Sequence, residues 1–344
     1  MMYRRIRPLL FNIDPERAHD LILSLIGAAG FLSPIINILR KIYFPKIYNP
    51  VEFAGLSFPN PVGLAAGYDK NGISWRGLSL LGFGHIEIGT VTPRPQAGNP
   101  KPRIFRIPQE EALINRMGFP GKGAEFALKM IPKSGCSLAR DNIILGMNIG
   151  KNKDTLIQDA AQDYIDCLRL FYDRVDYFAV NVSSPNTMGL RKLQGKDLLE
   201  ELLQELMSER DKLQLELDKP LPVFVKLSPD LSDNELDGAL EAISGTSVDG
   251  VIAANTTIQR ENLLASDPGE EGGLSGKPVK ELSTSMIRKI HRRTAGTLPI
   301  IGVGGISSPE DALEKMEAGA GLVQIYSGLI FQGPSLVRDL LENL

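Results

Sequence analysis

Two asparagines flank a pair of serines in the segment that begins at Asn181, which makes it dense in hydrogen-bonding groups. Residues 181–187 read Asn-Val-Ser-Ser-Pro-Asn-Thr and follow an apolar run from Tyr177 to Val180. Each amide side chain is both a donor and an acceptor, so Asn181 and Asn186 together suit a planar ligand that carries amides. The proline stiffens the turn between them. A strand that ends in such a cluster is typical of the active-site rim of a βα barrel.

Polar or small residues also end the other apolar runs of the chain. They are Lys70, Thr90, Asn148, Lys226, Asn255, Thr256, Gly305, Tyr326 and Ser327. A single asparagine or threonine at a strand end is more often a turn residue, roughly two times in three. Strand ends that gather on one rim nevertheless predict a shared site. A lysine inside a barrel, such as Lys226, needs an anion nearby, either a ligand or a carboxylate.

Two glycine-containing segments suggest where a phosphate would bind. Gly302-Val-Gly-Gly305 and Ser327-Gly328 follow the seventh and eighth apolar runs. Glycine lets backbone N–H groups approach an anion closely, and these two loops are a frequent phosphate site in βα barrels. Together with Lys226 and the asparagines, they predict a phosphorylated planar cofactor at the mouth, for which flavin mononucleotide (FMN) is suitable.

Short apolar runs alternate with helical patterns from residue 50 onward. Strands are expected at Val62–Ala66, His85–Thr90, Ile143–Ile149, Tyr177–Val182, Val223–Leu227, Gly250–Ala254, Pro299–Val303 and Gly321–Tyr326. Helices are expected at Ile73–Leu81, Ala124–Met130, Asp154–Phe171, Lys196–Leu217, Asp233–Ile243, Val279–Arg293, Pro309–Ala318 and Pro334–Leu341. Uninterrupted apolar strands are typical of a parallel sheet buried on both faces. We therefore predict an α/β fold, a (β/α)8 TIM barrel with a small N-terminal helical extension; an open doubly wound sheet is the alternative.

Composition narrows the class of protein. The chain has 344 residues, a net charge of −3 and a pI near 5.8, which offers no basic footprint for nucleic acid. Its three histidines are far apart in the sequence, so a histidine-based metal site is not expected. Cys136 and Cys167 have no paired spacing and are expected to be free, structural thiols.

The N-terminal segment is apolar enough to raise the question of a membrane. Residues 21–39 carry no charge, about the length of a spanning helix, but Gly27, Gly30 and Pro34 interrupt the run. The pattern indicates two short amphipathic helices with basic flanks, which could lie in the membrane interface. A helical hairpin packed on the main core is the alternative, with about equal weight.

Eight motifs of the chain, taken in order, resemble those of the class 2, quinone-dependent dihydroorotate dehydrogenases. They are Ala-Ala-Gly-Tyr-Asp-Lys (65–70), Ile-Gly-Thr-Val-Thr-Pro-Arg-Pro-Gln (88–96), Asn-Arg-Met-Gly-Phe (115–119), Asn-Ile-Gly-Lys-Asn-Lys (148–153), Asn-Val-Ser-Ser-Pro-Asn-Thr (181–187), Ala-Asn-Thr-Thr (254–257), Gly-Gly-Leu-Ser-Gly (272–276) and Val-Gln-Ile-Tyr-Ser-Gly (323–328). The resemblance extends to the N-terminal Asp-Pro-Glu-Arg-Ala-His (14–19). It implies oxidation of dihydroorotate to orotate in pyrimidine synthesis, with FMN as hydride acceptor and a membrane quinone as final acceptor.

The resemblance also implies roles for individual residues. Ser184, where soluble class 1 enzymes carry cysteine, is then the base for the C5 proton. Serine is a poor base by itself, so we expect Lys70 to offset substrate charge, and our hypothesis is that Thr187 relays the proton with an ordered water. The residues implied to bind FMN are Ala66, Gly67, Tyr68, Asp69, Lys70, Thr90, Asn148, Asn181, Lys226, Ala254, Gly276, Gly305, Tyr326 and Ser327. Those implied to bind substrate are Lys70, Asn115, Arg116, Met117, Gly118, Phe119, Asn181, Asn186, Asn255 and Thr256. Those that match positions near the quinone head are His19, Arg106 and Tyr326.

Three positions depart from the family pattern. Tyr68 stands where leucine or phenylalanine is commoner, and Ala254 replaces a frequent threonine. Phe119-Pro-Gly121 replaces an asparagine-rich continuation, so that loop is expected to move differently.

On this basis the chain has two parts. Residues 1–45 are expected to form a membrane-associating, quinone-tunnel segment and residues 46–344 the FMN-binding catalytic barrel. The expected protein is a monomer, bound peripherally to the cytoplasmic face of the inner membrane. Two other functions stay open. One is an FMN barrel that reduces another pyrimidine or uses a soluble acceptor such as fumarate, and the other is a non-catalytic membrane protein whose barrel binds a phosphate ligand.

Overall fold

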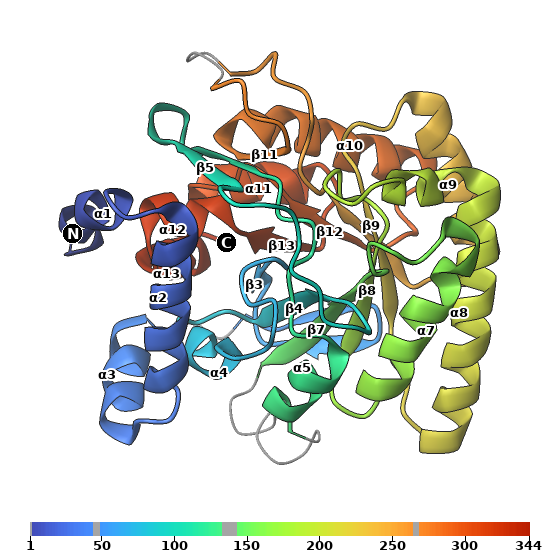
Figure 1. The fold of residues 1–344 in the computed structure, drawn as a ribbon, viewed down its shortest axis with the longest axis horizontal. Helices are drawn as coiled ribbons and strands as arrows, with labels where there is room; N and C mark the ends of the chain where they lie inside the picture. The colour runs from blue at the N-terminus through green and yellow to red at the C-terminus, as the bar shows by residue number, and fades with distance from the viewer. Residues whose placement is uncertain (1, 44–48, 133–142, 264–267) are drawn as a thin grey trace.

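A closed barrel of eight parallel strands forms the centre of the molecule, as the computed structural model shows (Figure 1). The structure describes residues 2–43, 49–132, 143–263 and 268–344. Around the barrel the strand order is β10-β12-β13-β3-β4-β7-β8-β9. Neighbouring strands all run parallel, so their carboxyl ends meet on one rim. The barrel prediction is therefore confirmed, and the open doubly wound sheet is excluded.

The strands and helices follow the predicted alternation closely. The barrel strands are β3 (Val62–Leu64), β4 (His85–Val91), β7 (Ile144–Ile149), β8 (Tyr177–Asn181), β9 (Val223–Leu227), β10 (Gly250–Ala253), β12 (Ile300–Val303) and β13 (Leu322–Ile325). The helices of this part are α4 (Trp75–Ser79), α5 (Ala124–Met130), α7 (Ala160–Phe171), α8 (Lys196–Leu217), α9 (Asp233–Gly245), α10 (Lys280–Arg293), α11 (Pro309–Glu317), α12 (Ser327–Gln332) and α13 (Ser335–Leu341). Two predictions were wrong: α7 begins six residues later than 154, after a 3-10 turn, and α12 was missed.

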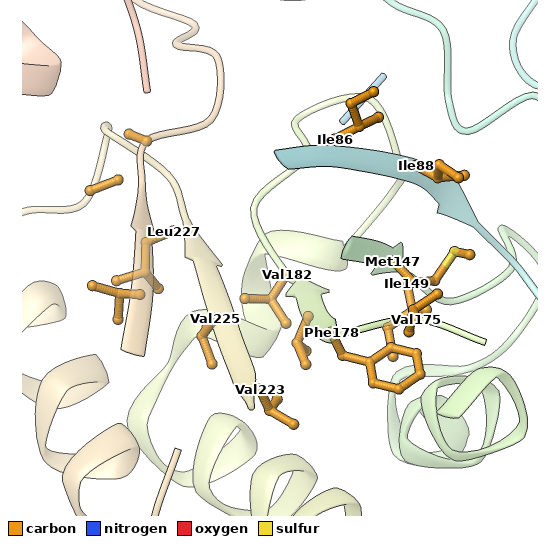
Figure 2. Close-up of a cluster of buried hydrophobic side chains, with 14 of the residues drawn as sticks. Ile86, Ile88, Met147, Ile149, Val175, Phe178, Val182, Val223, Val225 and Leu227 are labelled. Carbon is orange, nitrogen blue, oxygen red and sulfur yellow. The ribbon is translucent and has the colours of Figure 1, made fainter. Parts of the chain in front are cut away.

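Alternate residues of each strand face the helices and the barrel interior. The outward set, which packs in the layer between strands and helices, includes Ile86, Ile88, Met147, Ile149, Phe178, Val223, Val225 and Leu227 (Figure 2). On β9, Phe224 instead packs inward among apolar residues, and Lys226 is the next inward position toward the rim. Along β9, the barrel interior therefore changes from an apolar position to a charged one nearer the mouth.

Two small sheets close the ends of the barrel. Strands β1 (Val51–Phe53) and β2 (Leu56–Phe58) form a hairpin whose Phe53 stacks 5.9 Å from Phe224 inside the barrel. Strands β5 (Ile104–Ile107), β6 (Ala112–Asn115) and β11 (Gly273–Gly276) form an antiparallel sheet beside the mouth (Figure 1). Neither sheet was predicted, because the strands are three or four residues long and β6 pairs with β11 across 158 residues.

Three helices precede the barrel, namely α1 (Met2–Phe11), α2 (Pro15–Ala29) and α3 (Ser33–Tyr43). The last two were predicted and α1 was not. Gly27 does not interrupt α2 as expected; a Cβ there would lie 2.9 Å from the Ile73 carbonyl oxygen. On the facing helix, a Cβ at Gly77 would lie 1.9 Å from the Ile26 carbonyl oxygen. These glycines thus allow α2 and α4 to touch backbone to backbone.

The outer face of the N-terminal helices stays apolar and exposed. Its exposed residues are Leu21, Leu25, Phe31, Leu32, Ile35, Ile38 and Ile42. Within the described ranges, none of the helices is both long and apolar enough to cross a bilayer by itself. The helices α2 and α3 meet that measure only as a pair, bent by 109°. The pair therefore packs on the barrel with one side and presents an apolar surface with the other.

Candidate active site

One cavity lies at the barrel mouth, with a volume of about 1050 Å³ including its open side. The predicted residues that line it are Ala66, Gly67, Lys70, Thr90, Asn115, Met117, Gly118, Phe119, Asn181, Ser184, Asn186, Lys226, Ala254, Asn255, Thr256, Gly276, Gly305, Tyr326 and Ser327. The predicted residues that are not part of its lining are His19, Tyr68, Asp69, Arg106, Arg116, Asn148 and Thr187. Sequence reasoning missed Ser275 and Gln324, although both belong to motifs that it had quoted.

A chain of hydrogen bonds joins the ends of β4, β7 and β8. Thr90 Oγ1 donates to Asn148 Oδ1 at 2.5 Å, and Asn181 Nδ2 donates to the same two oxygens at 2.9 and 3.2 Å. Asn181 Oδ1 accepts from Asn255 Nδ2 at 3.3 Å, and this amide also donates to Ser183 Oγ at 2.9 Å. Asn148 therefore lies beneath the cavity and holds in place the two side chains that line it, Thr90 and Asn181.

Lys226 lines the cavity, and it pairs with a carboxylate, which is one of the two alternatives expected for this residue. Its Nζ lies 3.3 Å from Glu87 Oε1, and the two side chains are 5% and 0% exposed. The same carboxylate accepts from Asn148 Nδ2 at 2.8 Å, Gln324 Nε2 at 2.9 Å and Tyr177 Oη at 3.3 Å. Glu87 was missed; the signal for it was the one acidic residue in a strand that is buried along its whole length.

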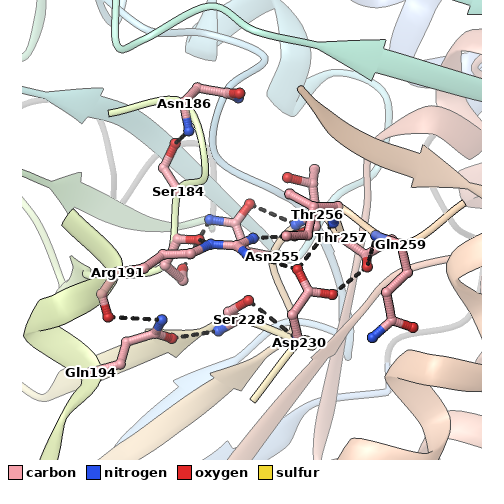
Figure 3. Close-up of polar contacts among 12 residues, drawn as sticks. Ser184, Asn186, Arg191, Gln194, Ser228, Asp230, Asn255, Thr256, Thr257 and Gln259 are labelled. Atoms are coloured by element: carbon pink, nitrogen blue, oxygen red, sulfur yellow. Dashed lines mark hydrogen bonds and ion pairs between the residues drawn. The ribbon is translucent and has the colours of Figure 1, made fainter. Parts of the chain in front are cut away.

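An arginine holds together the loop that carries Ser184 (Figure 3). Arg191 donates from Nε to the Ser183 carbonyl at 3.0 Å and from Nη2 to the Thr256 carbonyl at 3.1 Å. Its Nη1 pairs with Asp230 Oδ2 at 2.7 Å. One planar guanidinium thus connects the loops that follow β8, β9 and β10. Ser184 is consequently held in a fixed position at the wall of the cavity, where it is 6% exposed.

Charged and hydroxyl groups near Ser184 complete this side of the cavity. Lys70 Nζ donates to the Gly67 carbonyl at 2.6 Å, and burial lowers the pKa of Lys70 to about 8, against the opposing charge of Glu16. Thr187 Oγ1 is buried and has no hydrogen-bond partner in the part of the chain that is described. A buried hydroxyl without a partner fits an ordered water molecule at that position.

The sheet of β5, β6 and β11 reaches the same loop through a pair of amides. Asn186 Nδ2 donates to Asn115 Oδ1 at 3.1 Å, and Asn115 Nδ2 donates to the Gly273 carbonyl at 3.3 Å. Asn99 Nδ2 donates to the Asn186 carbonyl at 3.1 Å. Both asparagines that line the cavity here therefore keep their orientation through neighbours from distant parts of the chain.

Another part of the cavity is a cradle formed by glycine backbone and two serine hydroxyls. Gly276 and Gly305 have φ angles of +99° and +73°, and a Cβ on Gly305 would lie 2.4 Å from Lys280 Cα. The hydroxyls of Ser275 and Ser327 are 2.9 Å apart at the same place. Backbone N–H groups and paired hydroxyls in such a cradle are the donors that a phosphate monoester needs. This end of the site fits the phosphate of FMN, and the amide-lined part fits its planar ring.

Three aromatic rings connect the cavity to the N-terminal helices. Tyr326 lines the cavity, the Tyr68 ring lies 5.8 Å from it, and the His19 ring of α2 lies 5.0 Å from Tyr68. Burial, with a smaller contribution from the charge of Lys70, lowers the pKa of His19 to about 3, so the imidazole is neutral at physiological pH. Arg106 on β5 donates to carbonyl groups at the turn between α1 and α2.

The side chains of two predicted binding residues have partners within the protein. Asp69 accepts from the backbone N–H groups that lead into α4. Arg116 pairs with Glu270 at 2.5 Å and donates to the Pro102 carbonyl. Cys167 is a buried free thiol whose pKa is raised by burial, and Cys136 lies outside the described residues.

Comparison with known proteins gives a consistent result. The family model for dihydroorotate dehydrogenase matches residues 49–344. A protein named dihydroorotate dehydrogenase (quinone) from Stutzerimonas stutzeri strain A1501 is 49% identical over 344 residues, which cover 100% of this chain and 98% of the relative. The protein of that name from Vibrio parahaemolyticus is 47% identical, with 100% of both chains covered. A crystal structure of the Eimeria tenella enzyme in complex with ferulenol has a TM-score of 0.87 at 37% identity, covering 96% of this chain and 90% of that one.

Proposed function

The chain belongs to the dihydroorotate dehydrogenase family, as a quinone-dependent member, and we propose that its barrel mouth holds FMN beside dihydroorotate. Its activity is the oxidation of dihydroorotate to orotate in pyrimidine biosynthesis, with a quinone as the final acceptor. This identity sets aside a soluble acceptor such as fumarate and a purely non-catalytic barrel. The observation that carries the proposed site is that Lys70, Ser184 and Lys226 line one cavity.

FMN would supply the hydride acceptor, and the proposed contacts follow the two ends of the cavity. The phosphate would lie in the cradle of Gly276, Gly305 and Ser327, where backbone groups and a hydroxyl can donate to it. Thr90, Asn181 and Lys226 would orient the ring from below, since their positions are held by hydrogen bonds among themselves and to buried neighbours. Ala66, Gly67 and Ala254 leave room for the flat face of the ring.

Dihydroorotate would bind between this ring and the loop that carries Ser184. The amides of Asn115, Asn186 and Asn255 would bind the pyrimidine ring, and Lys70 would bind negative charge on the substrate. Ser184 Oγ would take the C5 proton while a hydride leaves C6. No histidine or carboxylate in the described residues hydrogen-bonds Ser184 Oγ, so the proton needs another path. The unpartnered hydroxyl of Thr187, with a water molecule, would carry it outward.

The quinone would approach along the N-terminal helices, within residues 1–45. His19 and Tyr326 lie at the two ends of the ring series that joins α2 to the cavity, and Arg106 holds the turn before α2. The exposed apolar face of α2 and α3, with Arg40 and Lys41 at its end, is suited to the membrane interface. We infer a monomer that associates peripherally with the cytoplasmic face of the inner membrane through this face.

The test is a visible spectrum of the purified protein. A bound flavin that bleaches with dihydroorotate and recovers with a quinone supports the site, and a protein without flavin absorbance contradicts it. Ser184→Ala is expected to retain flavin and orotate binding and to slow bleaching by orders of magnitude. Unchanged bleaching in this variant would reassign the base.

The quinone route has its own test. A protein that lacks residues 1–45 is expected to keep its flavin and bleach normally, yet to react poorly with long-chain quinones. Equal turnover with long-chain quinones in the full and shortened proteins would remove the N-terminal segment from the proposal.

A further inference from the structure

We propose that Glu87 sets the reduction potential of the bound flavin by offsetting the charge of Lys226. The inference deepens the proposed function and rests on FMN binding at the barrel mouth. Glu87 touches no cavity surface itself: it is fully buried on β4, and Lys226 lies between it and the cavity. It is therefore a positioning and electrostatic residue that acts through another side chain.

The charges of this pair balance inside the barrel. Lys226 Nζ lies 3.3 Å from Glu87 Oε1. The other donors to the carboxylate among the described residues are on Asn148, Gln324 and Tyr177, and all three are neutral. The pair therefore presents no net charge beneath the cavity. Two-electron reduction adds one negative charge to a flavin that takes up one proton, and a nearby positive charge favours that form. A carboxylate behind the lysine reduces this preference.

Hydrogen bonding alone does not require an acid at position 87. A glutamine there keeps an oxygen that accepts from Lys226 and Asn148. Its NH2 group has an acceptor available, because Gln324 Oε1 is buried without a hydrogen-bond partner in the described residues. The Gln324 amide can turn to present that oxygen. The negative charge, whose burial is costly, is therefore the feature that the glutamate alone supplies.

The experiment is the midpoint potential of FMN bound to Glu87→Gln, measured by equilibration with a reference dye. The variant leaves Lys226 without its counter-charge, so the reduced flavin gains stability. We expect the two-electron equilibrium constant to shift toward reduction by tenfold or more, which is a positive shift of about 30 mV or more. In stopped flow, bleaching by dihydroorotate should stay fast while reoxidation by quinone slows.

Tyr177→Phe is the matched control. It removes a hydrogen bond to the same carboxylate, at Oε2, without changing any charge. Its potential should stay within a twofold change of the equilibrium constant. An equal shift in both variants would assign the effect to hydrogen-bond geometry and overturn the proposal.

Other outcomes are equally decisive. An unchanged or more negative potential in Glu87→Gln refutes the proposal. If this variant does not retain FMN, the effect of the Glu87 charge is measured by comparing the FMN potential of Lys226→Gln with that of the double variant Lys226→Gln, Glu87→Gln. These two proteins differ only at residue 87. Loss of FMN from every folded variant without the carboxylate would make Glu87 structural and also overturn it. A wild-type protein that binds no FMN would instead contradict the proposed function.

Discussion

Because α2 and α4 lie so close together, one methyl group added between them should slow reoxidation of the flavin by quinone but not its reduction by dihydroorotate. A Cβ at Gly77 would lie 1.9 Å from the Ile26 carbonyl oxygen, whereas real Cβ atoms essentially never come closer than 3.0 Å. In Gly77→Ala the backbones of α2 and α4 must therefore separate by at least about 1.1 Å at this point. The atom in the way is backbone, so no side-chain rotation can relieve the clash.

The cost and its consequence follow from the position of α2. Overpacking of this kind costs about 1–3 kcal/mol, which corresponds to a 5- to 150-fold shift toward a displaced helix. That helix carries His19, whose ring is 5.0 Å from Tyr68, so the proposed quinone end of the ring series is disturbed. Lys70 and Ser184 lie on loops of the barrel and keep their partners.

The assay is stopped-flow absorbance of the flavin in each half-reaction. We expect bleaching by dihydroorotate within about twofold of the wild-type rate and reoxidation by quinone slowed about fivefold or more. The control is Gly245→Ala at the end of α9, where an added Cβ meets no described atom within 4 Å. A folded Gly77→Ala protein with wild-type reoxidation would refute the reasoning, and so would an equal loss in both half-reactions.

Three further predictions concern charged groups. Arg191→Lys should slow bleaching at least tenfold with little change in reoxidation, since an ammonium cannot bridge the three loops. The control is Arg169→Lys, whose exposed side chain pairs with α8, and equal bleaching rates in the two variants would refute the role of Arg191. Because the pKa of Lys70 is lowered to about 8, the KM for anionic dihydroorotate should be constant below pH 8 and should increase as the pH is raised beyond 8. A KM that stays constant up to about pH 9.5 would contradict the proposal that Lys70 binds the substrate charge. Burial raises the pKa of Glu16, but hydrogen bonds from Arg103 and Lys101 outweigh it and leave the pKa below 4.5. The stabilisation that Glu16 gives to the α2 contact is therefore full above about pH 4.5 and is lost as the pH falls further. In Glu16→Gln the thermal unfolding midpoint should no longer change with pH in this range, and the free energy of unfolding should be lower by about 3–5 kcal/mol.

The order of strands and helices could be predicted because it depends on local patterns. Each barrel strand is a short apolar run buried on both faces, and polar or glycine residues lie at or just after the end of each one. The carboxyl ends of parallel strands share one rim, so residues as distant as Lys70 and Ser327 were expected together and do line one cavity. The family, and with it the chemistry, followed from the same motifs.

Other features depend on pairs of residues that no local pattern connects. The sheet of β5, β6 and β11 joins residues 158 positions apart. Arg191 reaches Asp230 and Thr256 across loops whose lengths do not predict their contact. Gly27 was predicted to interrupt the helix, and it is instead a point of close approach to α4.

The direction in which a buried polar side chain points also could not be predicted from the sequence. The amino-acid sequence determined that β4 is a buried strand, but only the closed barrel decides that Glu87 turns inward, meets Lys226 and excludes water from the pair. The physical reason is that apolar burial is encoded residue by residue, whereas the pairing of buried polar groups depends on distances that exist only once the strands have closed on one another.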